Sequence, residues 1–170
     1  MKKLFYVFVL VMLNTAVQAQ KYAVIDTKFI LSKIPEYVDA DKKLAAVSEQ
    51  WQKEIDEMQN SLDQMYKNYD AEQYMLSDEL KKKREDELFN KEREVRDMQK
   101  KRFGYQGDLF KEREKLVKPI QDRVYNAIQK MAIARGYDFI LDKSEGITVI
   151  FADPKLDKSN DVLTTMGIKF

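Results

Sequence analysis

The sequence predicts a mostly helical protein with a small β body, from which a long antiparallel helical hairpin projects. One observation is a highly charged helical stretch that spans residues 37–135 with almost no interruption. The others are short apolar segments typical of strands, at 22–26 before this stretch and at 138–142 and 147–151 after it. A chain that leaves a sheet as a long helix and returns to the same sheet must fold back on itself. Such a hairpin is too long to lie inside a compact core.

Residues 1–19 have the pattern of a signal peptide. A basic pair at 2–3 precedes an apolar run at 4–13, which is too short to cross a bilayer. Small residues at positions 17 and 19 suit a cleavage site, so we expect an exported mature chain that begins at Gln20. An uncleaved N-terminal membrane anchor is the alternative.

The composition argues against an enzyme. Without histidine or cysteine, the commonest general base, the thiol nucleophile and the usual transition-metal ligands are all missing. The five glycines fit neither the phosphate-binding motif G-x-x-x-x-G-K-S/T nor the dinucleotide-binding motif G-x-G-x-x-G. From these observations together, we expect no catalytic residue, no metal and no cofactor. The formal net charge of +1 falls to −1 when Lys2 and Lys3 are removed, which does not favour a nucleic-acid partner.

The outgoing helix carries a heptad pattern. Two apolar series, each with a step of seven, interleave as the a and d positions of a coiled coil. They are Leu44, Trp51, Met58 and Met65, and Ile55, Leu62, Tyr69 and Leu76. Pro35 lies where such a helix can begin. The hairpin arm is therefore expected at 37–118, with its tip near 75–79.

The returning helix is expected to start after Ser77, a good N-cap residue. Its seam contains Leu80, Leu88, Val95, Met98, Tyr105, Leu109 and Leu116, and it is diluted by Arg84, Lys91 and Arg102. Gly104 and Gly107 are placed inside this helix, where they either let the arm bend or allow close helix packing. Pro119 should kink the helix before it enters the body, and Gly136 should end it.

The two helices of the arm have opposite charge. Residues 44–79 contain nine acidic and two basic residues, a net charge of −7, whereas residues 80–118 contain 14 basic and nine acidic residues, a net charge of +5. Antiparallel packing sets these helices against each other, and this bias disfavours wrong pairings. A solvated charged surface is the compatible simpler interpretation.

Aromatic residues are more numerous along the arm than a two-helix seam can hold, although Tyr69 and Tyr105 are expected to pack in it. The others suit a promiscuous surface for unfolded apolar chain; these candidate binding residues are Tyr66, Tyr74, Phe89, Phe103 and Phe110. Four basic residues near the tip are Lys81, Lys82, Lys83 and Arg84. They either contact phosphate, lipid headgroups or an acidic partner, or they are simply solvated.

The body is expected at 20–36 and 119–170, with a last helix from Asn160, as its cap, to about Met166. Its short strands are apolar on both faces and need cover on both faces. One chain offers little cover, so we expect several copies to share these strands. The predicted oligomerisation residues are Val24, Ile25, Phe139, Ile140, Leu141, Val149 and Ile150.

Over its whole mature length the chain resembles the Skp (OmpH-like) family of periplasmic chaperones. The resemblance rests on the order and spacing of five segments: YAVIDTKFIL, the charged hairpin, KLVKPIQDRVYNAI, GYDFILD and NDVLTTM. It implies a periplasmic homotrimer with a small β-rich body and three helical tentacles around a cavity. It also implies ATP-independent holding of unfolded outer-membrane proteins. A structural or adaptor coiled coil of the envelope, which binds one folded partner, is the alternative function. Family members are often strongly basic, and this chain departs from that pattern.

Overall fold

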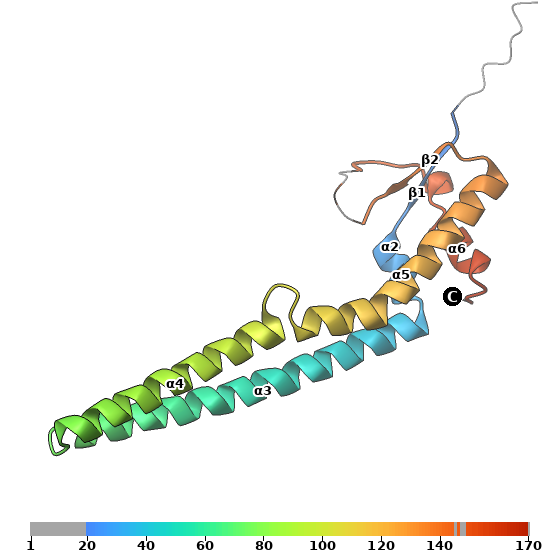
Figure 1. The fold of residues 1–170 in the computed structure, drawn as a ribbon. Helices are drawn as coiled ribbons and strands as arrows, with labels where there is room; N and C mark the ends of the chain where they lie inside the picture. The colour runs from blue at the N-terminus through green and yellow to red at the C-terminus, as the bar shows by residue number, and fades with distance from the viewer. Residues whose placement is uncertain (1–19, 145, 147–148, 170) are drawn as a thin grey trace, which may run out of the picture.

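The computed structural model of the protein describes residues 20–144, 146 and 149–169, so the expected signal peptide lies outside the described residues. The described part is mostly helical with a small sheet, as predicted (Figure 1). The elements in chain order are β1 (Tyr22–Ile25), α2 (Thr27–Ser32), α3 (Pro35–Glu72), α4 (Asp78–Phe103), α5 (Asp108–Arg135), β2 (Phe139–Asp142), the 3-10 helix η1 (Pro154–Leu156) and α6 (Ser159–Thr165).

The sheet has two parallel strands, with Tyr22 beside Phe139 and Ile25 beside Asp142. Both strands were predicted. The third predicted strand is wrong where the structure describes it: residues 149–151 lie outside any strand, and residues 147–148 lie outside the described part. The chain instead reaches β1 at 157–158, through a parallel bridge from Asp157 to Val24. Ile150 and Phe151 are consequently left 94% and 83% exposed.

The body has a core of its own. Buried side chains from β1, α2, the start of α3, α5 and α6 form one cluster: Ile25, Ile30, Ile34, Ala40, Leu44, Val117, Ile120, Val124, Ala127, Met131, Val162 and Leu163. The expectation that one chain cannot cover its strands is therefore wrong for β1, of which Ala23, Val24 and Ile25 are buried. It holds for β2, where Phe139 is exposed and the following residues are only half-buried.

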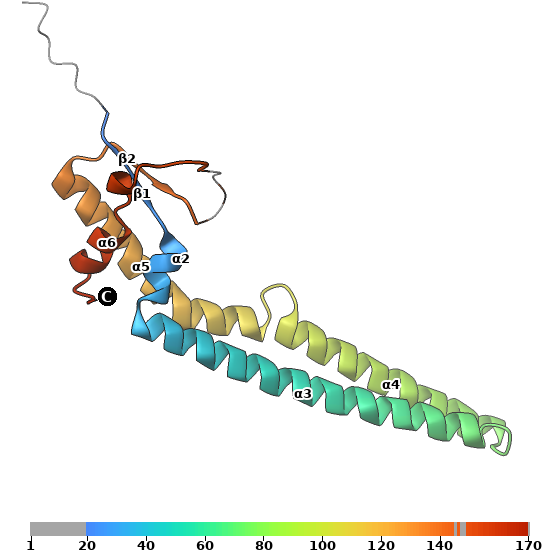
Figure 2. The same cartoon turned by 180° about the vertical axis from the view of Figure 1, so that it is seen from behind.

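The arm consists of α3, which leaves the body, and α4, which returns beside it, as Figures 1 and 2 show. At 1.5 Å per residue, the 38 residues of α3 span about 57 Å. Leu62, Leu88 and Val95 are buried between the helices, with Met58, Met65 and Tyr69 packed against them. These contacts confirm the central part of the predicted seam.

The ends of the helices follow the predicted signals. The Ser77 hydroxyl accepts a hydrogen bond from the backbone N–H of Leu80 at 3.4 Å, and Gly136 ends α5 in the left-handed conformation with φ 65°. Pro119 lies inside α5. Figures 1 and 2 show α5 changing direction between its start beside α3 and its end in the body, which is the kink that a proline predicts.

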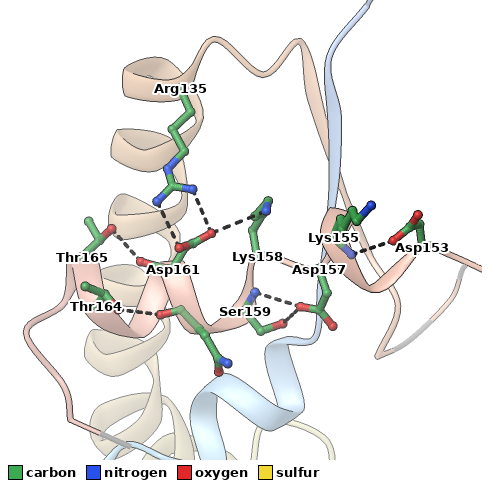
Figure 3. Close-up of polar contacts among 10 residues, drawn as sticks. Arg135, Asp153, Lys155, Asp157, Lys158, Ser159, Asp161, Thr164 and Thr165 are labelled. Carbon is green, nitrogen blue, oxygen red and sulfur yellow. Dashed lines mark hydrogen bonds and ion pairs between the residues drawn. The ribbon is translucent and has the colours of Figure 1, made fainter.

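Polar contacts fix α6 to the body (Figure 3). Arg135 of α5 donates to both carboxylate oxygens of Asp161 at 2.9 and 3.0 Å. The predicted cap at Asn160 is wrong, because α6 begins at Ser159. The carboxylate of Asp157 accepts hydrogen bonds from the N–H and hydroxyl of Ser159 at 2.9 and 2.6 Å. A carboxylate two residues before the helix therefore does the work expected of the Asn160 side chain.

Candidate binding surface of the arm

The arm presents apolar side chains to solvent. All five candidate binding residues are exposed: Tyr66, Tyr74, Phe89, Phe103 and Phe110. Tyr74, at the connection between α3 and α4, is 88% exposed. Sequence reasoning missed Met75 and assigned Leu80 to the seam, yet both are exposed near the same end of the arm. Leu80 leaves the seam because it belongs to the first turn of α4, next to the connection.

Phe103 and Phe110 come together at one groove of about 520 Å³, where α4 ends and α5 begins. Leu44, Ala45 and Ser48 of α3 line the opposite side. The remaining lining residues are Asp41, Gly104, Tyr105, Gln106, Leu109 and Arg113. The other three candidates lie elsewhere on the arm. The groove is thus the place where predicted binding residues form a concave apolar surface.

The groove exists because the returning helix is broken at residues 104–107. The placement of Gly104 and Gly107 inside one helix is therefore wrong. A Cβ atom on Gly104 would lie 2.3 Å from the carbonyl oxygen of Lys100, and one on Gly107 would lie 2.8 Å from that of Lys101. Between them, Gln106 has a left-handed φ of 55°. Only glycine fits both ends of this connection.

The break also makes the predicted position of Tyr105 wrong. It was expected in the seam but is 95% exposed, because it lies in the connection that leaves the helix axis. Tyr69, the other tyrosine assigned to the seam, does pack against the buried cluster of the arm. The connection therefore adds an exposed aromatic ring to the rim of the groove.

Arg102, near the end of α4, lies beside the break, where it contacts both α3 and α5. Its guanidinium donates to Asp108 of α5 at 2.9 Å, lies 3.5 Å from the carboxylate of Glu54, and is 4.6 Å from the centre of the Trp51 ring. The side chain is 22% exposed, and its Nε atom is buried with no hydrogen-bond partner. A residue expected to weaken the seam instead covers the tryptophan of that seam.

Two tyrosines join the helices nearer the tip. The hydroxyl of Tyr66 donates to Glu92 and that of Tyr69 donates to Glu85, each at 2.6 Å. These hydrogen bonds are the main reason that the pKa of each tyrosine is raised. Among ion pairs of the described residues, Arg102–Glu54 alone joins α3 to α4. The predicted pairing of opposite charges between the helices therefore contributes one ion pair. The two tyrosines of α3 bind glutamates of α4, although α4 is the helix with the positive net charge.

The basic residues near the tip lie on the first turns of α4. Lys82, Lys83 and Arg84 are exposed, and Lys81 is half-buried. Arg84 donates to Glu87 of its own helix at 2.9 Å. Carboxylates at 78–79 and 85–87 flank the four basic residues on both sides, so the tip has mixed charge. Their binding to headgroups or to a partner stays a prediction.

The comparison with family models gives one match that covers nearly all of the described chain. The model described as "Outer membrane protein (OmpH-like)" matches residues 21–166. The chain belongs to the OmpH-like family. A crystal structure of a candidate outer membrane chaperone (OmpH-like) from Caulobacter crescentus is similar in fold, with a TM-score of 0.65 and 16% identity; the match covers 87% of this chain and 84% of that one. The search of curated proteins gives no match.

The predicted oligomerisation residues of this OmpH-like chain fall into two groups. Val24 and Ile25 are buried inside the single chain. Phe139 and Ile150 are exposed, and Ile140, Leu141 and Val149 are half-buried. Tyr22 of β1 stacks on Phe139 of β2 with 6.0 Å between ring centroids, so the two-stranded sheet begins with an exposed aromatic pair. A shared sheet edge stays a prediction for the second group.

The described residues contain neither a candidate metal site nor a candidate membrane-spanning helix. Within them, no group of three or more acidic side chains is arranged to hold a metal ion. None of the described helices is both long and apolar enough to cross a membrane. The arm surface, with its exposed aromatic side chains and its groove, is the candidate site.

Proposed function

We propose that this OmpH-like chain is an ATP-independent holdase chaperone of the periplasm, which binds unfolded outer-membrane proteins and prevents their aggregation. The observation that carries the proposal is the set of exposed aromatic and apolar side chains on a helical arm that projects from a separate body. Unfolded β-barrel chains expose apolar residues that no single lock-and-key site can recognise. A spread of exposed rings, with a groove at Phe103 and Phe110, supplies many weak contacts instead.

The proposal includes a homotrimer, in which three bodies join through the exposed edge of β2 and three arms enclose a cavity. The exposed Phe139 of β2 supports it, because a large apolar group on an edge strand invites pairing. Ile150 and Phe151 add exposed apolar surface outside the sheet. Mass measurement of the mature protein tests this part. A mass of three chains is expected. A stable monomer would contradict the homotrimer and, with it, the cavity between three arms.

Client holding is tested by diluting an unfolded outer-membrane β-barrel protein out of urea, with and without the chaperone and ATP. Protection from aggregation, equal in both ATP conditions, is expected. The double variant Phe103→Ala/Phe110→Ala should protect less while its mass and helicity stay unchanged. Tyr125→Ala is the matched control, since Tyr125 is an exposed aromatic residue of α5 that does not line the groove.

Two outcomes would overturn the holdase function. One is no protection by the native protein, and the other is protection that requires ATP. Either result would favour an adaptor role in which the arm binds one folded envelope partner. Periplasmic export has its own test, since mass analysis of the exported chain should show Gln20 as the first residue.

A further inference from the structure

We propose that Arg102 is a positioning residue that pins the helix break to α3 and thereby fixes the groove between Phe103 and Phe110. The part of this inference that concerns unfolded clients rests on the proposed function. The pin, by which we mean the contacts of Arg102 with Asp108, Glu54 and Trp51, concerns only the conformation of the arm. Two glycines by themselves would suggest a free hinge at the break, whereas the pin would hold the break in one conformation.

The connection at 104–107 has little to hold it in place. Tyr105 and Gln106 are exposed, so no side chain of the connection is anchored in a core. Its internal hydrogen bond joins the N–H of Gly107 to the carbonyl oxygen of Gly104 at 2.8 Å. The ion pair between Arg102 and Asp108 spans the connection from one helix to the next. It therefore closes a segment that glycine residues would otherwise leave free.

The same guanidinium also attaches the break to the continuous helix α3. Glu54 and Trp51 are three residues apart on α3 and so lie on one face of it. The guanidinium pairs with the first and covers the ring of the second. A planar, fork-shaped group can satisfy two carboxylates and stack on a ring at once, which a lysine ammonium cannot do. This position therefore requires arginine, and lysine cannot replace it fully.

Three contacts together fix the orientation of the guanidinium. One terminal nitrogen lies 2.9 Å from the carboxylate of Asp108, the other lies 3.5 Å from that of Glu54, and the ring of Trp51 covers one face. A rotation of the side chain that preserved one of these contacts would break the others.

The two ends of the pin lie next to the two aromatic walls of the groove. Phe103 follows Arg102 directly, and Phe110 comes two residues after Asp108. Opening the ion pair would let the end of α4 and the start of α5 move apart, and the walls with them. Loss of Arg102 should therefore weaken client binding through the groove without removing an aromatic residue.

Trp51 provides the direct test, because it is the only tryptophan of the chain. Arg102→Met keeps an apolar stem but removes the guanidinium, and acrylamide quenching of Trp51 should rise about twofold as the ring loses its cover. Amide exchange at 100–112 should become about tenfold faster, since local opening governs it. Arg96→Met is the matched control, because Arg96 is 68% exposed and pairs with Glu92 of its own helix. It should change neither quantity.

Further variants keep the test decisive. Asp108→Asn and Glu54→Gln should each reproduce part of the effect, and Arg102→Lys should restore only a minor part. Client protection by Arg102→Met should fall, and adding it to Phe103→Ala/Phe110→Ala should cause no further loss. Unchanged Trp51 quenching in Arg102→Met, or the same change in Arg96→Met, would overturn the pin. If the native protein protects no client, the proposed function fails while the fluorescence and exchange results still decide the pin.

Discussion

The body buries side chains from five elements around one cluster, whereas the arm buries its own along a single seam between two helices. The body cluster includes Ile30, Ile34, Val162 and Leu163, none of which is exposed at all. The arm cluster has three buried residues and three half-buried ones. Since hydrophobic stabilisation grows with the apolar area removed from water, the body should be the stable unit and the arm the adaptable one.

The polar contacts differ in the same direction. In the body they join segments that are far apart in sequence, such as Arg135 to Asp161 and Thr27 to Asp142. In the arm most ion pairs connect residues three or four apart on one helix, which stabilise the helix but not the hairpin. The arm can therefore open along its seam while each helix stays formed.

The largest loss of stability is expected from a substitution that leaves an empty space in the core of the body. Leu163→Ala removes a fully buried side chain from the central cluster, so the free energy of unfolding should fall by about 2–5 kcal/mol. Urea unfolding followed by circular dichroism measures it. A loss comparable to that of a surface substitution would contradict the role assigned to this cluster.

A smaller and more local effect is expected from the arm. Leu62→Ala should cost about 2 kcal/mol, because the narrow seam can collapse around the missing atoms. Amide exchange should speed up in α3 and α4 and stay unchanged in α5 beyond Pro119. Equal acceleration in body and arm would mean that the two regions unfold as one.

Acid should weaken the body through two carboxylates. Burial by itself would raise the pKa of Asp142, but hydrogen bonds from Thr27 and Ser144 outweigh it and hold the pKa below its ordinary value of 3.8. The pKa of Asp157 is likewise lowered despite burial, chiefly by Lys143, whose Nζ lies 2.7 Å away, and by Ser159. A lowered carboxyl pKa adds stability above the unfolded-state pKa and loses it as the pH falls through the folded-state value.

The stability of the body should therefore decline as the pH drops below about 3.8. Asp142→Asn should cost about 1 kcal/mol at neutral pH and make this decline shallower. Thermal unfolding at a series of pH values gives the measurement. An unchanged slope in the variant would show that Asp142 does not contribute to it.

The smallest effect is expected from a hydroxyl group of the arm. Tyr69→Phe removes the hydrogen bond to Glu85 but keeps the ring in the seam. Amide protection near residues 69 and 85 should fall by no more than about fivefold, as for one ordinary exposed hydrogen bond. Glu85→Ala removes the acceptor of the same hydrogen bond and should give a similar result. A much larger loss in Tyr69→Phe would mean that the hydroxyl organises the whole tip.

Local signals in the sequence predicted the helix ends at Ser77 and Gly136 and the central part of the seam. A serine at an N-cap, a glycine after a helix and a heptad series act over a few residues, so they can be recognised without the rest of the fold. The exposure of the five candidate binding residues was predicted in the same way, because a two-helix seam can hold only a limited number of aromatic rings. Their role in binding stays a prediction. Ile150 and Phe151 were misplaced because an apolar run has the same appearance whether or not a partner strand is within reach.

The break and the pin were not predictable by this means. Two glycines three residues apart in a helical pattern predict only a weaker helix. That the broken conformation leaves no room for a Cβ atom at Gly104 or Gly107 can be recognised only from the three-dimensional structure. Arg102 was counted as a defect of the seam, since periodicity assigns a position to a residue but does not reveal what a long side chain can cover.

The parallel pairing of β1 with β2 has a consequence for how the chain comes to be folded. Tyr22 pairs with Phe139, so the first strand has no partner until the entire arm has been synthesised. Pairing across so long a stretch is slow, because the entropy of closing the loop must be overcome first. The hairpin contains mainly near neighbours and can form in advance, which brings residue 139 back toward the start. During folding, a hairpin that has already formed would hold the two ends of the arm together, so that β1 and β2 need to close a much shorter loop.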